Sequence, residues 1–278
     1  MKLVASAKLR KAQKAIEGMR PYERTLAEIL AAVRTGESSP RADRNYFSDK
    51  FAEKPISAPP STTPAHDSPV PGKTAIIAIA SNSSLCGAFN ANVVRKALET
   101  IRACEGEVEV IPVGRKMAEA LRRAGYVQAG DFNDVIGHPS YEKSAGLARS
   151  LSERYLAGEL SRVVLVYNRF ISSARQEPVA EVYLPFGIPD QVGDDNDFII
   201  EPDAEALLAT LLPQVMMLKF HAAVLDSAAA EHAARTIAMQ TASDNAEELL
   251  GELTLEYNKG RQQKITAEIL DLLGGAAQ

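Results

Sequence analysis

Apolar residues recur at helical spacing over the first 34 residues of the chain. Glycine occurs there only at Gly18, and proline only at Pro21. The spacing predicts one long helix, with local strain around these two residues. The recurring apolar positions are Leu3, Leu9, Ile16, Leu26, Ile29, Leu30 and Val33.

The middle of the chain alternates short apolar runs with amphipathic stretches. Residues 74–80, 108–112 and 162–167 are predicted to be buried strands, and residues 91–103, 116–124 and 142–157 to be helices. This alternation predicts a parallel sheet with helices on its faces. Residues 179–184 alternate outward and inward positions, which is typical of a half-exposed edge strand.

The C-terminal part carries a long helical pattern. Apolar periodicity continues from about residue 202 to Leu273, interrupted only by Pro213. A continuous helix from Pro213 to Leu273 would be about 90 Å long, whereas a compact chain of this size has a radius of gyration of about 19 Å. The helix must therefore project from the rest of the molecule.

A partner for the projecting helix is also indicated. From Leu225 to Tyr257, steps of four and three give a 3.5-residue repeat that is typical of a coiled coil. Residues 1–24 carry seven Lys/Arg and two Asp/Glu, a balance of +5, and residues 226–278 carry four and nine, a balance of -5. We therefore expect the N-terminal helix to be the partner, with Leu250, Leu253 and Tyr257 in the shared seam.

Composition changes the boundaries and excludes several classes of protein. Proline, serine and threonine concentrate between Gly36 and Gly72, which predicts an irregular connector. The expected parts are thus residues 1–35, a first coiled-coil helix; 36–72, the connector; 73–201, an α/β domain; and 202–278, the last helix. With 278 residues, 46% of them apolar, and a net charge of -5, the chain is neither wholly disordered nor an electrostatic binder of nucleic acid. No apolar run approaches the roughly 18 residues needed to span a bilayer.

Candidate catalytic chemistry is sparse. Cys86 follows the first predicted strand, where sheet enzymes place active sites, but no histidine is spaced to serve as its base. Gly72, Lys73 and Thr74 precede a strand, whereas a phosphate-binding loop follows one. The four histidines show no metal-ligand spacing. We expect no catalytic residue, cofactor or metal, and keep as the alternative a cytoplasmic α/β enzyme with a Cys86 nucleophile and a helical dimerisation arm.

Two polar clusters are better candidates for contacts with other proteins. A basic run on the first helix contains Lys8, Arg10 and Lys11. Near the chain end, Gln262 and Thr266 share a helix face at a spacing of four, beside Arg261. Either cluster could be a solvated surface, but on a projecting rod each could equally contact surrounding subunits.

Several segments together resemble the gamma subunit family of the bacterial ATP synthase. They are MKLVASAKLRKAQ at 1–13, SLCGAFN at 84–90, EHAAR at 231–235 with Ala238-Met239, Asp244-Asn245-Ala246, and YNKGRQQKIT at 257–266. The resemblance implies a long antiparallel coiled coil of the N- and C-terminal helices plus a Rossmann-like α/β domain. It also implies a non-catalytic subunit of the proton-translocating ATP synthase, a rotary shaft that couples proton flow to ATP synthesis.

The same resemblance implies partners and a location. The shaft would turn inside a ring of alpha and beta subunits, with its foot beside the epsilon subunit and the membrane c-ring, peripheral to the cytoplasmic face of the cell inner membrane. The residues that it places against beta are Lys8, Arg10, Lys11, Arg261, Gln262 and Thr266.

The chain departs from the family pattern in two places. The family's Asp-x-Gly before Leu-Cys-Gly is Asn82-Ser83-Ser84 here. The family's first helix normally begins several turns before the position of Met1, so we expect further residues before Met1 in the assembled subunit. A first helix that begins at Met1 is expected to leave Val224 and Leu225 exposed.

Overall fold

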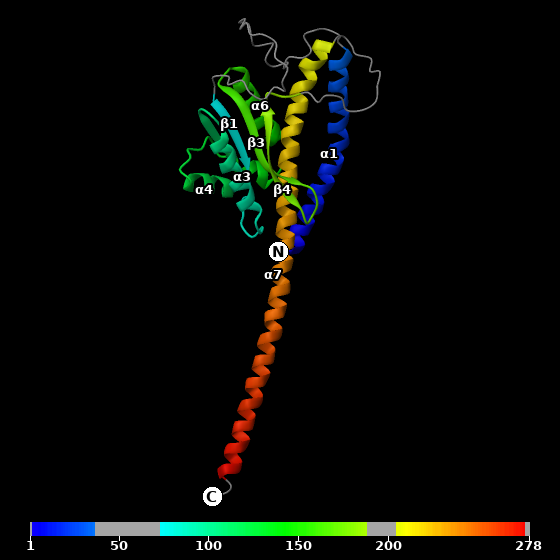
Figure 1. Ribbon diagram of the computed structural model, residues 1–278. Helices are drawn as coiled ribbons and strands as arrows, with labels where there is room; N and C mark the ends of the chain where they lie inside the picture. The colour runs from blue at the N-terminus through cyan, green and yellow to red at the C-terminus, as the bar shows by residue number, and fades with distance from the viewer. Residues whose placement is uncertain (1, 37–72, 188–203, 276–278) are drawn as a thin grey trace.

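The computed structural model describes residues 2–36, 73–187 and 204–275 (Figure 1). Apart from Gly36, the expected connector 36–72 lies outside the described residues. Within them, an α/β domain packs beside a pair of long helices, and one of these helices continues far beyond the domain. The predicted fold class is confirmed.

The sheet has four strands in the order β2-β1-β3-β4. The strands are β1 (Lys73–Ile79), β2 (Val108–Val113), β3 (Leu160–Phe170) and β4 (Gln176–Leu184). β1 pairs in parallel with β2 and β3, and β4 pairs antiparallel with β3 at one edge. β1 is buried on both faces after Lys73, which explains its unbroken apolar sequence.

Helices cover both faces of the sheet. The helices of the domain are α3 (Phe89–Ala103), α4 (Arg115–Arg123), α5 (Asn133–Gly137) and α6 (Tyr141–Leu156). Successive residues of a strand point to opposite faces, so Ile76 packs with α3 and α4 residues while Ile77 packs with α6 and the long C-terminal helix. The predicted domain helices are confirmed, and the short α5 was not predicted.

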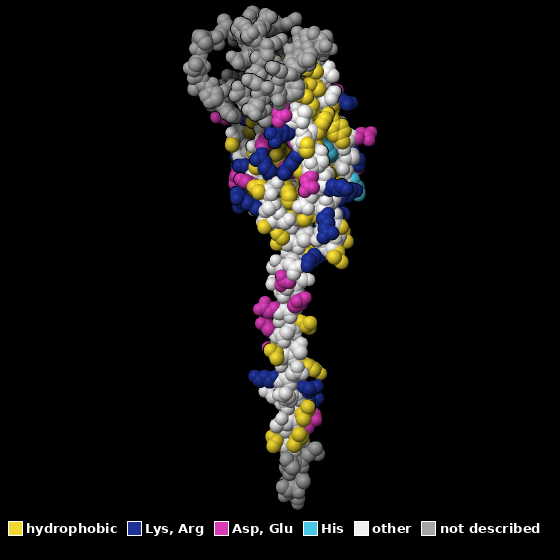
Figure 2. Space-filling view, turned by 90° about the vertical axis from the view of Figure 1, so that its right-hand side faces the viewer, with side chains coloured by type: hydrophobic (Ala, Val, Ile, Leu, Met, Phe, Trp, Pro, Cys, Tyr) yellow, Lys and Arg dark blue, Asp and Glu magenta, His cyan; other side chains and the backbone are white. Residues whose placement is uncertain are grey.

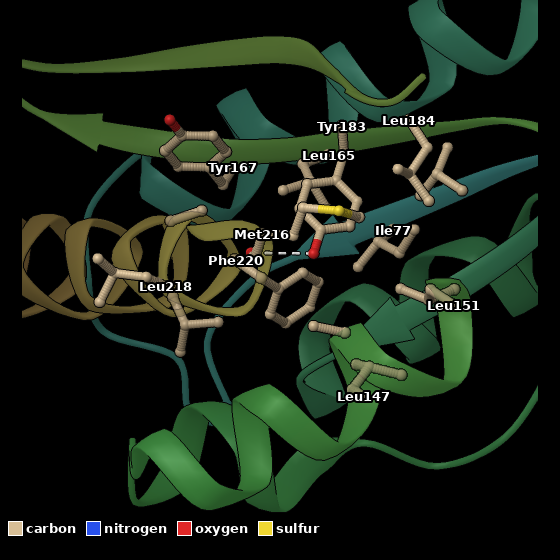
Figure 3. Close-up of a cluster of buried hydrophobic side chains, with 14 of the residues drawn as sticks. Ile77, Leu147, Leu151, Leu165, Tyr167, Tyr183, Leu184, Met216, Leu218 and Phe220 are labelled. Carbon is tan, nitrogen blue, oxygen red and sulfur yellow. Dashed lines mark hydrogen bonds between the residues drawn. The ribbon is translucent and has the colours of Figure 1, made fainter. Parts of the chain in front are cut away.

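The larger core joins the domain to the C-terminal helix, α7 (Ala204–Gly275). Figure 3 shows Phe220 of α7 between sheet residues and α6, with its ring edge-on to Tyr183 at 5.8 Å between centroids. The Tyr183 hydroxyl donates to the backbone oxygen of Met216 at 3.0 Å, which satisfies a polar group in the buried layer.

The N-terminal helix, α1 (Lys2–Gly36), packs antiparallel against the first part of α7 (Figure 1). Leu9 and Ile16 contact the region of Leu225 and Ala229, whereas Leu30, nearer the end of α1, joins the core that contains Leu212. Pro21 and Pro213 lie inside continuous helices.

The expected exposure of Val224 and Leu225 is wrong. Both are buried, because the antiparallel pairing places the first turns of α1 beside residues 225–233 of α7. The part of α7 that no other described element covers lies further along, towards the C-terminus. The 72 residues of α7 make a helix of about 108 Å, and the 35 residues of α1 make one of about 52 Å.

The expected seam at Leu250, Leu253 and Tyr257 is also wrong for this chain. These side chains are 66%, 53% and 69% exposed, and from Thr241 to Leu270 every residue is exposed except the half-buried Asn258. The expected charge pairing is limited in the same way. Asp226 and Glu231 lie beside α1, while the acidic residues at 244–256 lie on the exposed part of α7.

Among the described residues, α7 is also the one helix long and apolar enough to cross a membrane by length and composition. Its most apolar window has a mean hydropathy of 1.5, and 44% of that window is buried. Packing explains this composition, since Phe220, Val224 and Ala229 of α7 are fully buried against the sheet, α6 and α1.

Candidate functional site

The helix α7 has a near half, packed up to about Met239, and a distal half, exposed from Thr241 onward. We call the level at which it leaves the body of the molecule, residues 230–241, the neck. The loop between β1 and α3, residues 80–88, packs there against α7. Cys86 and Phe89 form a buried cluster with Ala230, and Ala234 packs beside them. A Cβ built on Gly87 would lie 3.9 Å from the Ala238 Cβ, so the loop backbone runs close to the helix. Small residues four apart on α7 make this approach possible.

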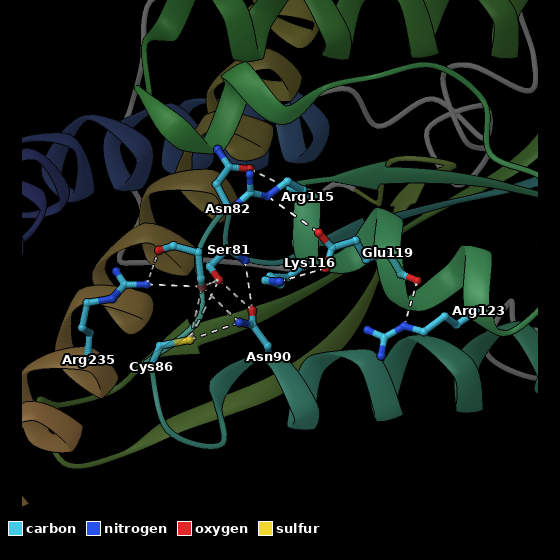
Figure 4. A network of polar contacts seen from close by, with 10 residues as sticks. Ser81, Asn82, Cys86, Asn90, Arg115, Lys116, Glu119, Arg123 and Arg235 are labelled. Carbon is cyan, nitrogen blue, oxygen red and sulfur yellow. Dashed lines mark hydrogen bonds and ion pairs between the residues drawn. The ribbon is translucent and has the colours of Figure 1, made fainter. Parts of the chain in front are cut away.

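Polar contacts hold the loop in one conformation (Figure 4). The Ser81 hydroxyl donates to the backbone oxygen of Ser83 at 2.6 Å. The Asn90 amide of α3 donates to the Cys86 sulfur at 3.1 Å and accepts from the Ser81 backbone N–H at 3.2 Å. Leu85 has a φ of 65°, an unfavourable backbone conformation for a leucine that these contacts stabilise.

Asn82 connects the same loop to two other elements. Its Oδ1 accepts the backbone N–H of Arg115, at the start of α4, at 2.9 Å. Its Nδ2 donates to the backbone oxygen of Asn133, at the start of α5, at 2.9 Å. The loop is therefore attached to α3, α4 and α5 as well as to β1.

Arg235 of α7 reaches this loop from the helix side. Its Nη1 donates to Glu231 Oε1 at 2.6 Å, and its Nη2 donates to the Ser83 hydroxyl at 2.8 Å. Longer contacts run from Nη2 to the backbone oxygens of Ser83 and Ser84, at 3.5 and 3.4 Å. Burial raises the pKa of Glu231, and the hydrogen bond from Arg235 opposes that rise.

The residues that the structure describes do not give Cys86 the partners of a nucleophile. Its side chain is 1% exposed, and its sulfur is hydrogen-bonded by Asn90. Of the described histidines, His221 is hydrogen-bonded to Ser144 on α6. His232 lies on α7, where the positive charges of Arg235 and Lys8 help to lower its pKa. Among the described residues no base contacts the sulfur, which is also buried, so Cys86 packs at the neck.

A shallow cavity of about 340 Å³ lies beside α4, at the carboxyl end of β2. Arg115 and Arg122 line it together with Glu119 and Asp131, so charges of both signs face it. Glu119 is already paired with Lys116 at 2.8 Å. No group of three or more metal-ligating side chains occurs within the ranges that the structure describes.

Two buried ionisable groups of α7 lie near α1, and one of them, Asp226, also lies near β3. Burial raises the pKa of Asp226 to about 6, against the opposing effects of Arg20 and Arg169. Burial likewise lowers the pKa of His232 to about 4, helped by the positive charges of Arg235 and Lys8. The near half of α7 therefore carries ionisable groups inside its packing interface.

The basic cluster predicted from the sequence lies at the neck. Lys8, Arg10 and Lys11 are exposed near the start of α1, and the charge of Lys8 acts on Glu231 and His232. The distal cluster is also exposed. Thr266 donates its hydroxyl to the backbone oxygen of Gln262 at 2.9 Å, which places both on one helix face as predicted.

The structure does not bring these two clusters together. About 30 residues of α7 separate the level of Lys8 from Gln262, which corresponds to about 45 Å along the helix. Arg235, Glu231 and Ser83 were not predicted from the sequence to be functional residues. The i, i+4 spacing of Glu231 and Arg235 was visible, but it does not show which loop the arginine reaches.

Comparison with known proteins identifies relatives over the whole length. A family model described as ATP synthase matches residues 1–278. The chain is 44% identical over 286 residues to an ATP synthase gamma chain of Bacteroides fragilis, with 99% of this chain and 91% of that one covered. It is 42% identical over 296 residues to an ATP synthase gamma chain of Bacteroides thetaiotaomicron, with 100% and 92% covered.

Solved structures share the fold. A chain of the Tetrahymena thermophila mitochondrial ATP synthase, in a structure of the central stalk and c-ring, matches with a TM-score of 0.60 and 22% identity, covering 87% of this chain and 97% of that one. A chain of the Euglena gracilis mitochondrial enzyme matches with a TM-score of 0.55 and 20% identity, covering 98% and 94%.

Proposed function

Because the chain belongs to the ATP synthase gamma chain family, we propose that it acts as the central rotary shaft of a proton-translocating ATP synthase. The observation that carries this proposal is the distal half of α7, a single helix that extends far from the body with its apolar side chains exposed (Figures 1 and 2). Such a surface requires surrounding protein, because isolated apolar helices in water are marginal.

The distal half of α7 has chemically different sides, as a cam requires. Asp244, Glu248, Glu252 and Glu256 follow one another at a spacing of four and form an acidic stripe. Leu250 and Tyr257 lie on the opposite side of the helix by its 3.6-residue period, and Figure 2 shows acidic side chains just beyond the neck. As the rod turns, each surrounding subunit would meet these sides in succession, and differential contact energy would favour a different conformation in each.

The proposed partners follow from this geometry and from the relatives. Alpha and beta subunits would surround the distal half of α7. The α/β domain would face the epsilon subunit and the c-ring, since the Tetrahymena match is a chain in a structure of the central stalk and c-ring. The chain would thus be peripheral to the membrane, on the cytoplasmic face of the cell inner membrane.

The site residues take part as contacts, and we infer no chemical step for them. Lys8, Arg10 and Lys11 present positive charge at the neck, suited to an acidic loop of beta. Arg261, Gln262 and Thr266 present hydrogen-bonding groups on the exposed distal half, suited to the beta loops that surround it. The subunit itself would be non-catalytic, transmitting energy to active sites on beta.

Reconstitution tests this function. The chain should copurify as a single copy with three large nucleotide-binding subunits, and adding it to alpha and beta subunits should raise ATP hydrolysis. A passive coiled-coil adaptor would bind without changing ATP turnover, and an enzyme that used Cys86 would copurify with neither subunit. Either result would overturn the proposal.

A further inference from the structure

We propose that Arg235 is a positioning residue that fixes the 80–88 loop to α7, so that torque passes between the α/β domain and the rod at the neck. This inference rests on the proposed shaft function and adds, to the core that joins the domain to α7, a polar contact at the level of the neck. Arg235 lies six residues before Thr241, where the continuous exposure of α7 begins. It therefore lies near the last level at which the body holds the helix.

Apolar contact alone does not fix the loop against rotation of α7. The apolar side chains of α7 that face the loop are Ala230, Ala234 and Ala238, and none of them projects far enough to interlock with it. Packing of small residues permits close approach but resists sliding weakly, because few atoms interdigitate. A directional polar contact is needed to set the angle between the loop and the helix.

Arg235 has the geometry for that task. Glu231, one turn earlier on the same helix, holds one end of the guanidinium at 2.6 Å, and Ser83 accepts from the other end at 2.8 Å. The Arg235 side chain is only 14% exposed and that of Glu231 only 9%, so water competes little for this pair. A planar guanidinium can serve both partners at once, whereas an ammonium is a single point of charge.

The loop end of this contact is joined to the whole domain. The Ser83 backbone oxygen accepts from Ser81, at the end of β1, and Asn82 binds the starts of α4 and α5. Buried Asn168 of β3 donates to the backbone oxygen of Phe89 at 3.3 Å, beyond the other end of the loop. A force on α7 at Arg235 therefore reaches β1 and the two strands paired with it, β2 and β3, and also the helices α3, α4 and α5.

Hydrogen exchange on the full-length chain tests the contact directly. The Arg235–Ser83 hydrogen bond is charge-assisted but lies at the exposed side of the loop, so its loss should raise amide exchange of residues 83–89 about tenfold in Arg235→Gln and in Ser83→Ala. Strand β1 should be unchanged. Ser83→Thr keeps the hydroxyl and should retain the protection, whereas Arg235→Lys should lose most of it. The matched control is Arg95→Gln on the exposed face of α3.

A double-mutant cycle decides whether Arg235 and Ser83 act on each other. Adding Ser83→Ala to Arg235→Gln should raise loop exchange by less than about threefold more, because the contact is already gone. Independent, multiplying effects would overturn the pairing, as would unchanged loop exchange in both single variants.

The assembled complex in vesicles tests the mechanical role. Arg235→Gln should at least halve the protons pumped per ATP hydrolysed while ATP hydrolysis continues, and Ser83→Thr should couple normally. Full coupling in an Arg235→Gln complex with a loosened loop would overturn the torque role. If even the unaltered chain fails to assemble with alpha and beta, the proposed function fails, but the exchange result still decides the Arg235–Ser83 contact.

Discussion

The near and distal halves of α7 are one continuous helix with two different uses of apolar surface. Up to about Met239, α7 packs against α1, the sheet, α6 and the 80–88 loop, and Phe220, Val224 and Ala229 are fully buried. From Thr241 onward, leucines of similar character are exposed. Hydrophobic periodicity therefore reveals that a surface needs a partner, but not whether the partner belongs to the same chain.

The near half of α7 also has two separate packing surfaces on adjacent faces of the helix. Leu225, Ala229 and Ala233 receive α1, while Ala230 and Ala234, one residue further on, receive the loop that contains Cys86. The distal half has no surface that other described residues pack against. Its side chains contribute little to the stability of the chain itself, and substitutions there should act on assembly instead.

The largest expected difference between the halves is in stability. Phe220→Ala should lower the free energy of unfolding by about 3–5 kcal/mol, because it removes a fully buried ring and leaves a cavity between Tyr183 and α6. Leu250→Ala, at a position 66% exposed, should change it by less than about 0.5 kcal/mol. Denaturant unfolding of the full-length chain measures both. A similar cost at the two positions would show that the distal half is packed.

A second expected difference is in assembly with other subunits, where changes in the distal half should have the larger effect. Replacing Arg261 and Gln262 together by Ala should leave the unfolding of the isolated chain unchanged, because exposed helical positions tolerate Ala well. Assembly with alpha and beta should weaken, since each charge-assisted interface hydrogen bond contributes about 1.5–3 kcal/mol.

The measurements for the double variant are subunit copurification and ATPase activity. Arg102→Ala, on the exposed face of α3, is the control. If the double variant and the control both behave like the unaltered complex, the distal cluster is ordinary surface.

The sequence was sufficient to predict the elements because their signals are local. The strand β1 and the middle of β3 are apolar runs, and β4 lies at the sheet edge as predicted, although its last two residues, Tyr183 and Leu184, are both buried. The long helices were predicted from periodicity, and Pro21 and Pro213 did not break them. Among the described elements, only the five-residue α5 was missed, since a single turn carries too little periodicity to detect.

The register of the two long helices could not be obtained in the same way. A repeat that continues from Leu225 to Tyr257 fits a partner at any level, and it suggested a filled seam where the structure has a bare helix. The prediction that Val224 would be exposed failed for the same reason. The Arg235–Ser83 contact was also beyond reach, because it joins residues 152 positions apart.

A third prediction concerns the ionisable groups that only the near half buries. Asp226 has a pKa raised to about 6, so between pH 3.8 and 6 the folded chain binds more protons there than the unfolded chain does. Its contribution to stability falls as pH rises through this window. A pKa shift contributes about 1.4 kcal/mol per unit to the free energy of unfolding when the group is fully shielded from water. Because Asp226 is partly solvated, we expect a smaller total loss of stability, about 1–2 kcal/mol.

Asp226→Asn should therefore be about 1–2 kcal/mol more stable than the unaltered chain at pH 7, with the difference vanishing near pH 4. His232, which is titrated in an overlapping range, is present in both chains and does not enter the difference. Denaturant unfolding between pH 4 and 7 provides the comparison. A gain that does not depend on pH would mean that packing, not ionisation, sets the effect.

The smallest expected effect is at Cys86, where the near half seats the 80–88 loop. Cys86→Ala should lower the free energy of unfolding by about 1 kcal/mol, because it removes one buried sulfur beside Phe89 and Ala230. The Asn90 amide would keep its contact with the Ser83 backbone oxygen at 3.4 Å, so no buried donor is left unpaired. Cys104→Ala, at a half-buried position, should cost less.

Coupling of ATP hydrolysis to proton pumping should be intact in both variants, because the Arg235–Ser83 contact does not involve either sulfur. A stably assembled Cys86→Ala complex that has lost ATP synthesis would mean that the thiol does more than pack against α7.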